Sequence, residues 1–215
     1  MLTPSEREAI AGLWSEKLAQ DARGLPQSER HRNLEPPSAE LICALASGIR
    51  ARRLLEVGGS SGLSTIALAA AARATGGRLV SIEVEPSRQA LARQRLAGLG
   101  LSGHVDFVLA DAGHVLPQYD GLEFVLIDCE KEDYERFLAL LRLAPGALVV
   151  ADNILSHDLD QYVSAVRGYP GVESVTLAIG KGLEVSRFVK GSPGQRSQGR
   201  AVEPGDEGDE TPVTV

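Results

Sequence analysis

The sequence contains few cysteines and few aromatic side chains. Of its 215 residues two are cysteines, Cys43 and Cys129, and only 4% are aromatic. Two widely separated cysteines exclude a disulfide-rich scaffold and lack the spacing of cysteine metal ligands, so a reducing compartment fits. No stretch approaches 18 consecutive apolar residues, and the acid-containing start of the chain does not resemble a signal peptide. We therefore expect a cytoplasmic protein that does not span a membrane.

An excess of positive charge is also missing. The formal net charge is −7 at pH 7, which disfavours a nucleic-acid-binding surface, because such a surface needs clustered cations. Two local basic clusters exist, and solvated surface is the favoured interpretation of both: Arg30, His31 and Arg32, then Arg50, Arg52 and Arg53. What is present, 43% hydrophobic and 24% charged residues, is typical of a globular domain that is large enough to bury a core.

Residues 1–50 are expected to contain two helices. Thr3 and Glu6 have capping-box spacing and Pro4 would be the first helical residue, so a helix is predicted over 3–20. A loop is predicted over 21–37 and a second helix over 38–49.

From Arg53 onward, short apolar strands alternate with amphipathic helices. We expect strands at 53–57, 78–84, 104–109, 124–128, 147–153, 172–179 and 183–189, and helices at 62–74, 87–98, 131–142 and 158–167. This order predicts a doubly wound, Rossmann-like α/β fold over residues 51–190. Its seven-stranded sheet would be mostly parallel, with a C-terminal antiparallel hairpin and helices on both faces. Residues 191–215 are rich in Gly, Pro and acids, and are predicted to be a disordered acidic tail.

Acidic side chains stand where the strands end. Ligands of open parallel sheets bind beyond the carboxyl ends of the strands. The residues at those ends include Glu56, Glu83, Asp111, Asp128 and Asp152. One polar residue closing a strand is common, whereas five that meet in one crevice are hard to explain by structure alone.

The turn "EVGGSSGLST" joins the first strand to the next helix. It fails the dinucleotide fingerprint, because Ser60 and Leu63 occupy two of the three glycine positions counted from Gly58. This argues against a nucleotide-dependent oxidoreductase. Glu83 closes the second strand, where mononucleotide-binding folds place a carboxylate on a ribose diol, roughly 20 residues beyond the turn. The combination favours an adenosine-type ligand.

Three oxygen donors, Asp128, Asp152 and Asn153, end two strands that such sheets place side by side. Carboxylate and amide oxygens without His or Cys suit Mg²⁺ or a similar ion. Lys131 follows in the first turn of a helix, where a cation opposes the macrodipole. It is a candidate general base; the alternative is a surface lysine paired with a neighbouring acid.

Together these motifs resemble the metal-dependent branch of the class I S-adenosylmethionine-dependent O-methyltransferases, the family of the catechol and caffeoyl-CoA O-methyltransferases. The resemblance runs from about Leu34 to Val189 and includes "LLEVGGSSGLSTIALA", "VSIEVEP", "LADA" and the terminal hairpin. Its specific part is the spacing D-x-x-K-x-x-Y in "VLIDCEKEDY", followed by the D-N pair of "VVADN".

The resemblance implies a role for each site residue. Five residues would surround the methionine half of S-adenosylmethionine: Glu56, Gly58, Gly59, Ser60 and Ser64. Glu83 would hold the ribose, Asp111 and Ala112 would flank the adenine, and Asp128 would border the cofactor. Asp128, Asp152 and Asn153 would ligate Mg²⁺ (or Mn²⁺ or Ca²⁺), and Lys131 would be the base beside Asp128. Residues 1–50 would cap the site, and the chain would form a homodimer.

The expected function is methyl transfer from S-adenosylmethionine to a metal-bound hydroxyl of a small molecule. The scarcity of aromatic residues leaves a flat acceptor few stacking partners, so the acceptor stays open. One alternative is a tRNA hydroxyuridine O-methyltransferase with a basic rim formed by Arg30, Arg32, Arg50, Arg52 and Arg53. Another is a non-catalytic S-adenosylmethionine-binding protein, against which the complete set of metal-type residues and Lys131 argues.

Overall fold

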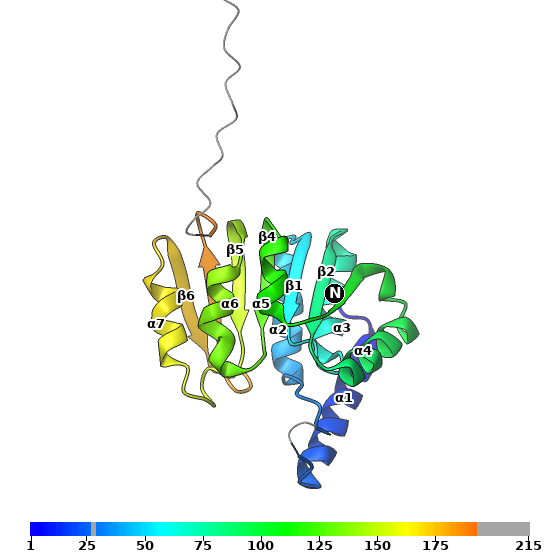
Figure 1. Cartoon of the computed structure of the whole chain (residues 1–215). Helices are drawn as coiled ribbons and strands as arrows, with labels where there is room; N and C mark the ends of the chain where they lie inside the picture. Colours follow the sequence, from blue (N-terminus) through cyan, green and yellow to red (C-terminus); the bar gives the residue numbers. More distant parts are fainter. Residues whose placement is uncertain (27–28, 193–215) are drawn as a thin grey trace, which may run out of the picture.

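A seven-stranded sheet forms the centre of the computed structural model, which describes residues 1–26 and 29–192 (Figure 1). The strand order is β3-β2-β1-β4-β5-β7-β6. The strands are β1 (Arg53–Val57), β2 (Arg78–Glu83), β3 (Val105–Leu109), β4 (Leu122–Ile127), β5 (Leu143–Ala151), β6 (Val172–Leu177) and β7 (Leu183–Phe188). Strands β1 to β5 pair in parallel, and β7 is antiparallel to both β5 and β6. The predicted fold class is confirmed.

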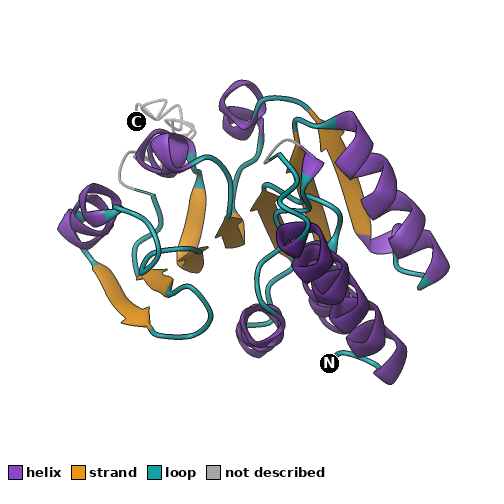
Figure 2. Ribbon diagram, turned by 90° about the horizontal axis from the view of Figure 1, so that it is seen from below, coloured by secondary structure: helices purple, strands orange, loops and turns teal. Residues whose placement is uncertain are grey.

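Helices cover both faces of this sheet (Figure 2). One face packs against α1 (Pro4–Ala22), α2 (Pro36–Gly48), α3 (Leu63–Thr75) and α4 (Pro86–Gly98). The other packs against α5 (Ala112–Val115), α6 (Tyr134–Leu140) and α7 (Asp160–Gly168). Short 3-10 turns occupy Ser102–His104 (η2), Leu116–Gln118 (η3) and Lys131–Asp133 (η4). No helix of the described residues combines the length and the apolar character that a membrane crossing requires.

Helix α3 lies between the sheet and helices α1 and α2, and its sequence suits that position. Its residues 63–72 are all buried. Small alanine side chains let helices approach closely without voids, which explains the alanine-rich sequence of a helix with no solvent-facing side over most of its length.

Several boundaries differ from the sequence prediction. The helix expected at 131–142 is shorter, because η4 precedes α6 and β5 begins at Leu143, where it already pairs with Leu122. Pro36 begins α2 instead of ending the preceding loop, since the first helical position needs no backbone N–H. The short helix α5 was not expected. The capping box at Thr3 is confirmed. The tail predicted at 191–215 lies almost wholly outside the described residues.

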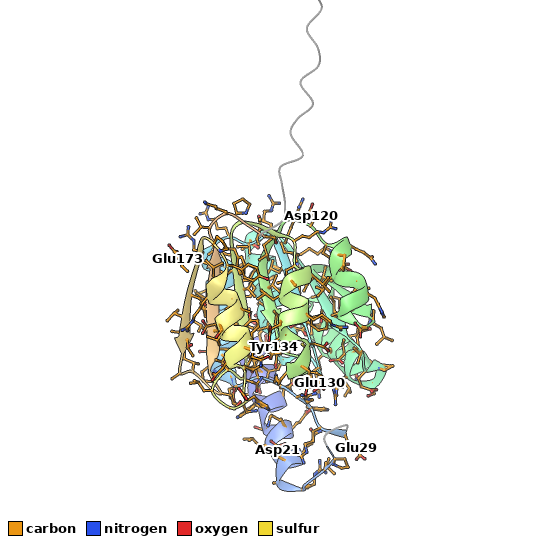
Figure 3. All side chains as sticks on the ribbon, turned by 60° about the vertical axis from the view of Figure 1, so that its left-hand side comes forward. Asp21, Glu29, Asp120, Glu130, Tyr134 and Glu173 are labelled. Atoms are coloured by element: carbon orange, nitrogen blue, oxygen red, sulfur yellow. The ribbon has the colours of Figure 1, made fainter. Side chains whose placement is uncertain are left out.

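The first helix projects beyond the end of the sheet at which the parallel strands finish. In Figure 3, Glu130 and Tyr134, which follow β4, lie near this end, and Asp21 and Glu29 lie beyond it, whereas Asp120, which precedes β4, lies at the opposite end. The end of α1 and the segment that follows it therefore overhang the crevice where the acidic strand ends meet.

Candidate active site

Two adjoining clefts open at the carboxyl ends of the strands. The first cleft encloses about 650 Å³ and is lined by Arg32, Val57, Gly58, Ser60, Ile82, Glu83, Val84, Arg88, Asp111, Ala112, Asp128, Cys129, Glu130, Asp133 and Phe137. The second encloses about 640 Å³ and is lined by Lys17, Asp21, Arg30, His31, Arg32, Asn33, Asp128, Lys131, Asp152, Asn153, His157 and Lys181. Arg32 and Asp128 belong to both linings. A ligand in one cleft would thus lie next to a ligand in the other.

Close backbone approach explains the glycines of the first turn. A Cβ atom on Gly58 would lie 2.0 Å from the backbone oxygen of Asp128, and the φ angle of Gly58 is +94°. A Cβ on Gly59 would lie 2.5 Å from the Ser81 hydroxyl. Both positions therefore exclude a side chain, and the turn lies directly against the end of β4.

Glu56 lies beneath this turn. It is fully buried and accepts hydrogen bonds from the hydroxyls of Thr65 and Ser81, the latter at 2.6 Å. Burial raises the pKa of its carboxyl group, and the hydroxyl hydrogen bonds, including one from Ser64, oppose that rise. Glu56, Gly59 and Ser64 do not line the first cleft; the structure shows them supporting the turn, and their contact with a cofactor stays a prediction.

Glu83 holds the turn in place from the side of β2. Its carboxylate accepts the backbone N–H of Ser60 at 2.7 Å and those of Val84 and Glu85 at 2.9 Å each. Ser60 itself has a left-handed φ of +46°. The structure brings six of the predicted cofactor residues together around the first cleft: Gly58, Ser60, Glu83, Asp111, Ala112 and Asp128.

Asp128, Asp152 and Asn153 converge at the floor of the second cleft. The Asn153 side-chain Nδ2 lies 2.9 Å from Asp128 Oδ1 and 3.0 Å from Asp152 Oδ2. Asn153 has a φ of +66°, which turns its amide back towards both carboxylates. Asp152 is 1% exposed, and its Oδ1 is buried without a hydrogen-bond partner. The predicted convergence of the three donors is present.

These two buried carboxylates lack sufficient compensating charge. Burial raises the pKa of Asp128, against the influence of Lys131. Burial and the charge of Asp128 raise the pKa of Asp152 to about 8. A divalent cation would offset both charges and satisfy the orphan Oδ1. Among the described residues no group of three or more His, Cys, Asp or Glu is placed to hold a metal, so Asn153 would have to supply the third oxygen by turning its amide. With that rotation the donor set fits an oxygen-preferring ion.

Lys131 lies beside this pair. Its Nζ is 3.4 Å from Asp128 Oδ1 and donates to the Tyr134 hydroxyl at 2.7 Å. Tyr134 is fully buried and donates in turn to the backbone oxygen of Asp152 at 3.2 Å. The sequence prediction omitted Tyr134 as a site residue, although the D-x-x-K-x-x-Y spacing contains it. Its side chain fixes the lysine relative to both aspartates.

The segment after α1 returns over the site. Arg32 forms an ion pair with Glu130 across the first cleft, and its backbone N–H donates to the Ser60 hydroxyl at 3.0 Å. The interpretation of residues 30–32 as solvated surface is wrong, because all three line the second cleft and the His31 side chain is only 13% exposed. In contrast, Arg50, Arg52 and Arg53 are exposed at the opposite end of β1, as expected.

Cys129 lines the first cleft and His157 lines the second. Burial raises the pKa of the Cys129 thiol, which disfavours the nucleophilic thiolate form. His157 lines the second cleft, and its Nδ1 lies 3.0 Å from the Ser156 hydroxyl.

Comparison with known proteins identifies a matching family model and related O-methyltransferases. A family model described as "Protein of unknown function (DUF1442)" matches residues 12–202. A catechol O-methyltransferase of Mycobacterium tuberculosis is 36% identical over 141 residues, which cover 64% of this chain and 62% of the relative. A putative O-methyltransferase of Mycobacterium sp. (strain KMS) is 30% identical, with 68% of this chain and 71% of the relative covered. The chain thus spans about three-fifths of the length of the catechol O-methyltransferase that it matches.

Solved structures share the fold. The O-methyltransferase TomG from Streptomyces achromogenes, determined in complex with SAM, superposes with a TM-score of 0.71 at 27% identity, covering 86% of this chain and 90% of that chain.

Proposed function

The chain belongs to the DUF1442 family and to the class I S-adenosylmethionine-dependent O-methyltransferases, and from this premise we propose that it transfers a methyl group from S-adenosylmethionine to a hydroxyl group of a small molecule. The observation that carries the proposal is the placement of Lys131 and Asp152 in the second cleft, next to Asp128, which lines both clefts. A methyl donor in the first cleft and a hydroxyl in the second would then face each other.

The first cleft suits the donor. Gly58 and Ser60 line this cleft from the first turn, and Glu83 presents a carboxylate that could accept ribose hydroxyls. Asp111 and Ala112 line the same cleft from the start of α5 and would flank the adenine. The structure of TomG with SAM supports this choice of ligand by similarity of fold and sequence.

The second cleft would hold the acceptor hydroxyl. A divalent cation, held by Asp128, Asp152 and Asn153, would make a hydroxyl group more acidic and fix its orientation. Lys131, in its neutral form, would take the hydroxyl proton at Nζ, 2.7 Å from the Tyr134 oxygen that positions it. The acceptor oxygen then forms its bond to the methyl carbon while the bond from that carbon to sulfur breaks, which leaves S-adenosylhomocysteine. Much of the rate would come from holding the two reactants in line.

The tRNA alternative loses part of its support. Its proposed rim needs five arginines near one opening, but Arg52 and Arg53 lie at the amino end of β1, away from both clefts. A small-molecule acceptor, a cytoplasmic location and a homodimer remain our proposals for this chain.

Two measurements test the function together. Calorimetry should detect binding of S-adenosylmethionine, and mass spectrometry should detect a methylated product from a diol acceptor in the presence of Mg²⁺. Absence of S-adenosylmethionine binding would reject the proposal. Binding without transfer to any acceptor would instead favour the non-catalytic alternative.

A further inference from the structure

The second cleft differs in chemistry from the chain as a whole. All of its lining residues are polar or charged, and none is Phe, Tyr or Trp. Five of them are lysine or arginine and three are aspartate, although the full chain carries a net charge of −7. Two of the aspartates, Asp128 and Asp152, belong to the candidate cation site. An uncharged aromatic molecule would find no apolar wall here, since ligand pockets for such molecules are mostly lined by hydrophobic side chains.

Most of the cations already have acidic partners. Lys17 and Arg30 both pair with Asp21, and Arg32 pairs with Glu130. Lys131 lies between Asp128 and Tyr134. The remaining cation, Lys181, has no ion pair or side-chain hydrogen bond to any residue within 1–26 and 29–192.

The β6–β7 hairpin holds Lys181 at the cleft. The flanking residues Gly180 and Gly182 have φ angles of +57° and +91°, and a Cβ on Gly182 would lie 2.4 Å from the Leu155 side chain. The backbone oxygen of Lys181 accepts the N–H of Leu155 at 2.8 Å. The hairpin is therefore pressed against the segment after β5, and Lys181 lines the cleft. The pKa of Asp21 is lowered mainly by the hydrogen bond from Lys17, and the charge of Lys181 adds to this effect after those of Lys17 and Arg30.

Two buried polar groups beside it also lack partners. Asn33 is 5% exposed, and its Nδ2 makes no hydrogen bond although its Oδ1 accepts one from Ser61. His31 Nδ1 likewise has no hydrogen bond and lies 3.6 Å from Glu16. Unpaired buried polar groups are costly and are rare without a functional reason. Both residues line the second cleft.

Resting on the methyl transfer proposed above, we propose that the acceptor is a hydroxylated small molecule that carries an anionic group, a carboxylate or a phosphate. Lys181 and the amide of Asn33 bind the anionic group, and His31 contributes a further contact. The acceptor hydroxyl lies at the opposite side of the cleft, beside Asp128 and Lys131. Charge complementarity, in place of aromatic stacking, then selects the substrate.

Acceptors that share one reacting diol and differ in charge test this assignment. Catechol is neutral, protocatechuate is anionic and dopamine is cationic, and a catechol phosphonate separates phosphate-like from carboxylate recognition. Binding is measured by calorimetry and transfer by mass spectrometry, at low and high salt. We expect an anionic acceptor to have a Kd at least roughly tenfold below that of catechol, since a charge-assisted hydrogen bond contributes about 1.5–3 kcal/mol. High salt should reduce the preference.

In the variant Lys181→Gln, the ratio of the Kd for catechol to the Kd for the anionic acceptor should fall towards one. Lys190→Gln, which removes an exposed lysine at the other end of β7, should leave the preference intact. Equal binding of all acceptors, an equal loss for catechol and anion in Lys181→Gln, or preferred transfer to undermodified tRNA would overturn the inference. Charge-selective binding without methyl transfer would reject the proposed function and retain the anion selectivity of the second cleft. Methyl transfer without charge selectivity would support the proposed function and reject the anion selectivity.

Discussion

At the scale of single residues, the site places two carboxylates where neither is well solvated. Asp152 is 1% exposed, its Oδ1 has no partner, and the nearby charge of Asp128 adds to the burial that raises its pKa to about 8. Burying like charges together is unfavourable for folding. Such an arrangement is expected where function, and not stability, determines the residue.

Replacing Asp152 with asparagine separates its contribution to function from its contribution to stability. We expect Asp152→Asn to lower turnover by roughly 10- to 100-fold, as loss of a ligand-orienting or ligand group does. The affinity for S-adenosylmethionine should not change, because Asp152 does not line the first cleft. The melting temperature should hold or rise, since the variant removes a carboxyl group whose ionisation is disfavoured by burial and by Asp128. A variant with unchanged turnover would remove Asp152 from the acceptor site.

The Lys131–Tyr134 pair makes a second prediction. Lys131→Ala should reduce kcat strongly, by on the order of 10²-fold or more, because general-base catalysis is lost, while S-adenosylmethionine binding is retained. Tyr134→Phe removes only the hydroxyl that bonds Lys131 Nζ and the Asp152 carbonyl. It should shift the pH profile of kcat and lower the free energy of unfolding by about 1 kcal/mol. A Tyr134→Phe variant with wild-type pH dependence would show that the tyrosine is only a packing residue.

At the scale of elements, the first turn depends on backbone contact. Gly58→Ala would force a Cβ to 2.0 Å from the Asp128 oxygen at a φ of +94°. We expect it to destabilise the fold by roughly 1–3 kcal/mol and to abolish S-adenosylmethionine binding. Gly12→Ala, inside α1 with nothing within 4 Å of the new methyl group, should stabilise by about 1 kcal/mol. Chemical denaturation measures the free energy of unfolding of both variants, and calorimetry measures their S-adenosylmethionine binding. Equal stability and equal binding of the two variants would show that the first turn does not depend on close backbone contact at Gly58.

The attachment of α1 to α3 should depend on pH. Glu6 is buried, which opposes its ionisation, but hydrogen bonds and charge from Arg73 together with bonds from Thr3 hold its pKa below the ordinary 4.5. A depressed native pKa contributes stability above the unfolded value, and that contribution is lost as pH falls through the native value. Glu6→Gln should therefore be less stable than wild type at pH 7, by about 1–3 kcal/mol. The difference should shrink below pH 4.5; a gap that persists at low pH would reject the ion pair as its source.

Local patterns predict the sheet and most helices, because β1 to β5 are apolar runs bounded by turn residues and most of the helices between them have apolar residues at helical spacing. The residues that end those strands were also predicted, since parallel strands bring their carboxyl ends to one edge. Contacts between distant segments could not be predicted. Arg32 meets Glu130 across 98 residues of sequence, and the turn holding Lys181 is fixed at the site by backbone hydrogen bonds from Ile154 and Leu155. Sequence reasoning likewise could not show that Glu56 lies below its turn.

At the scale of the whole molecule, charge is divided between the two clefts. The first cleft has five acids and two arginines in its lining, whereas the second has more cations than acids. S-adenosylmethionine carries a sulfonium and an ammonium group against one carboxylate, so we expect the acidic lining of the first cleft to favour it over its neutral product. The opposite potential of the second cleft would attract an anionic acceptor and orient both reactants before contact.

In the proposed reaction, a methyl donor in the first cleft meets a hydroxyl in the second, bound to a cation that Asp128, Asp152 and Asn153 would hold. Its most direct test is transfer of a labelled methyl group from S-adenosylmethionine to protocatechuate, measured with Mg²⁺, after EDTA treatment, and in Asp152→Ala. We predict transfer with Mg²⁺, and its loss in the other two conditions while the donor still binds. Transfer that persists at the same rate after EDTA treatment and in Asp152→Ala would contradict the account.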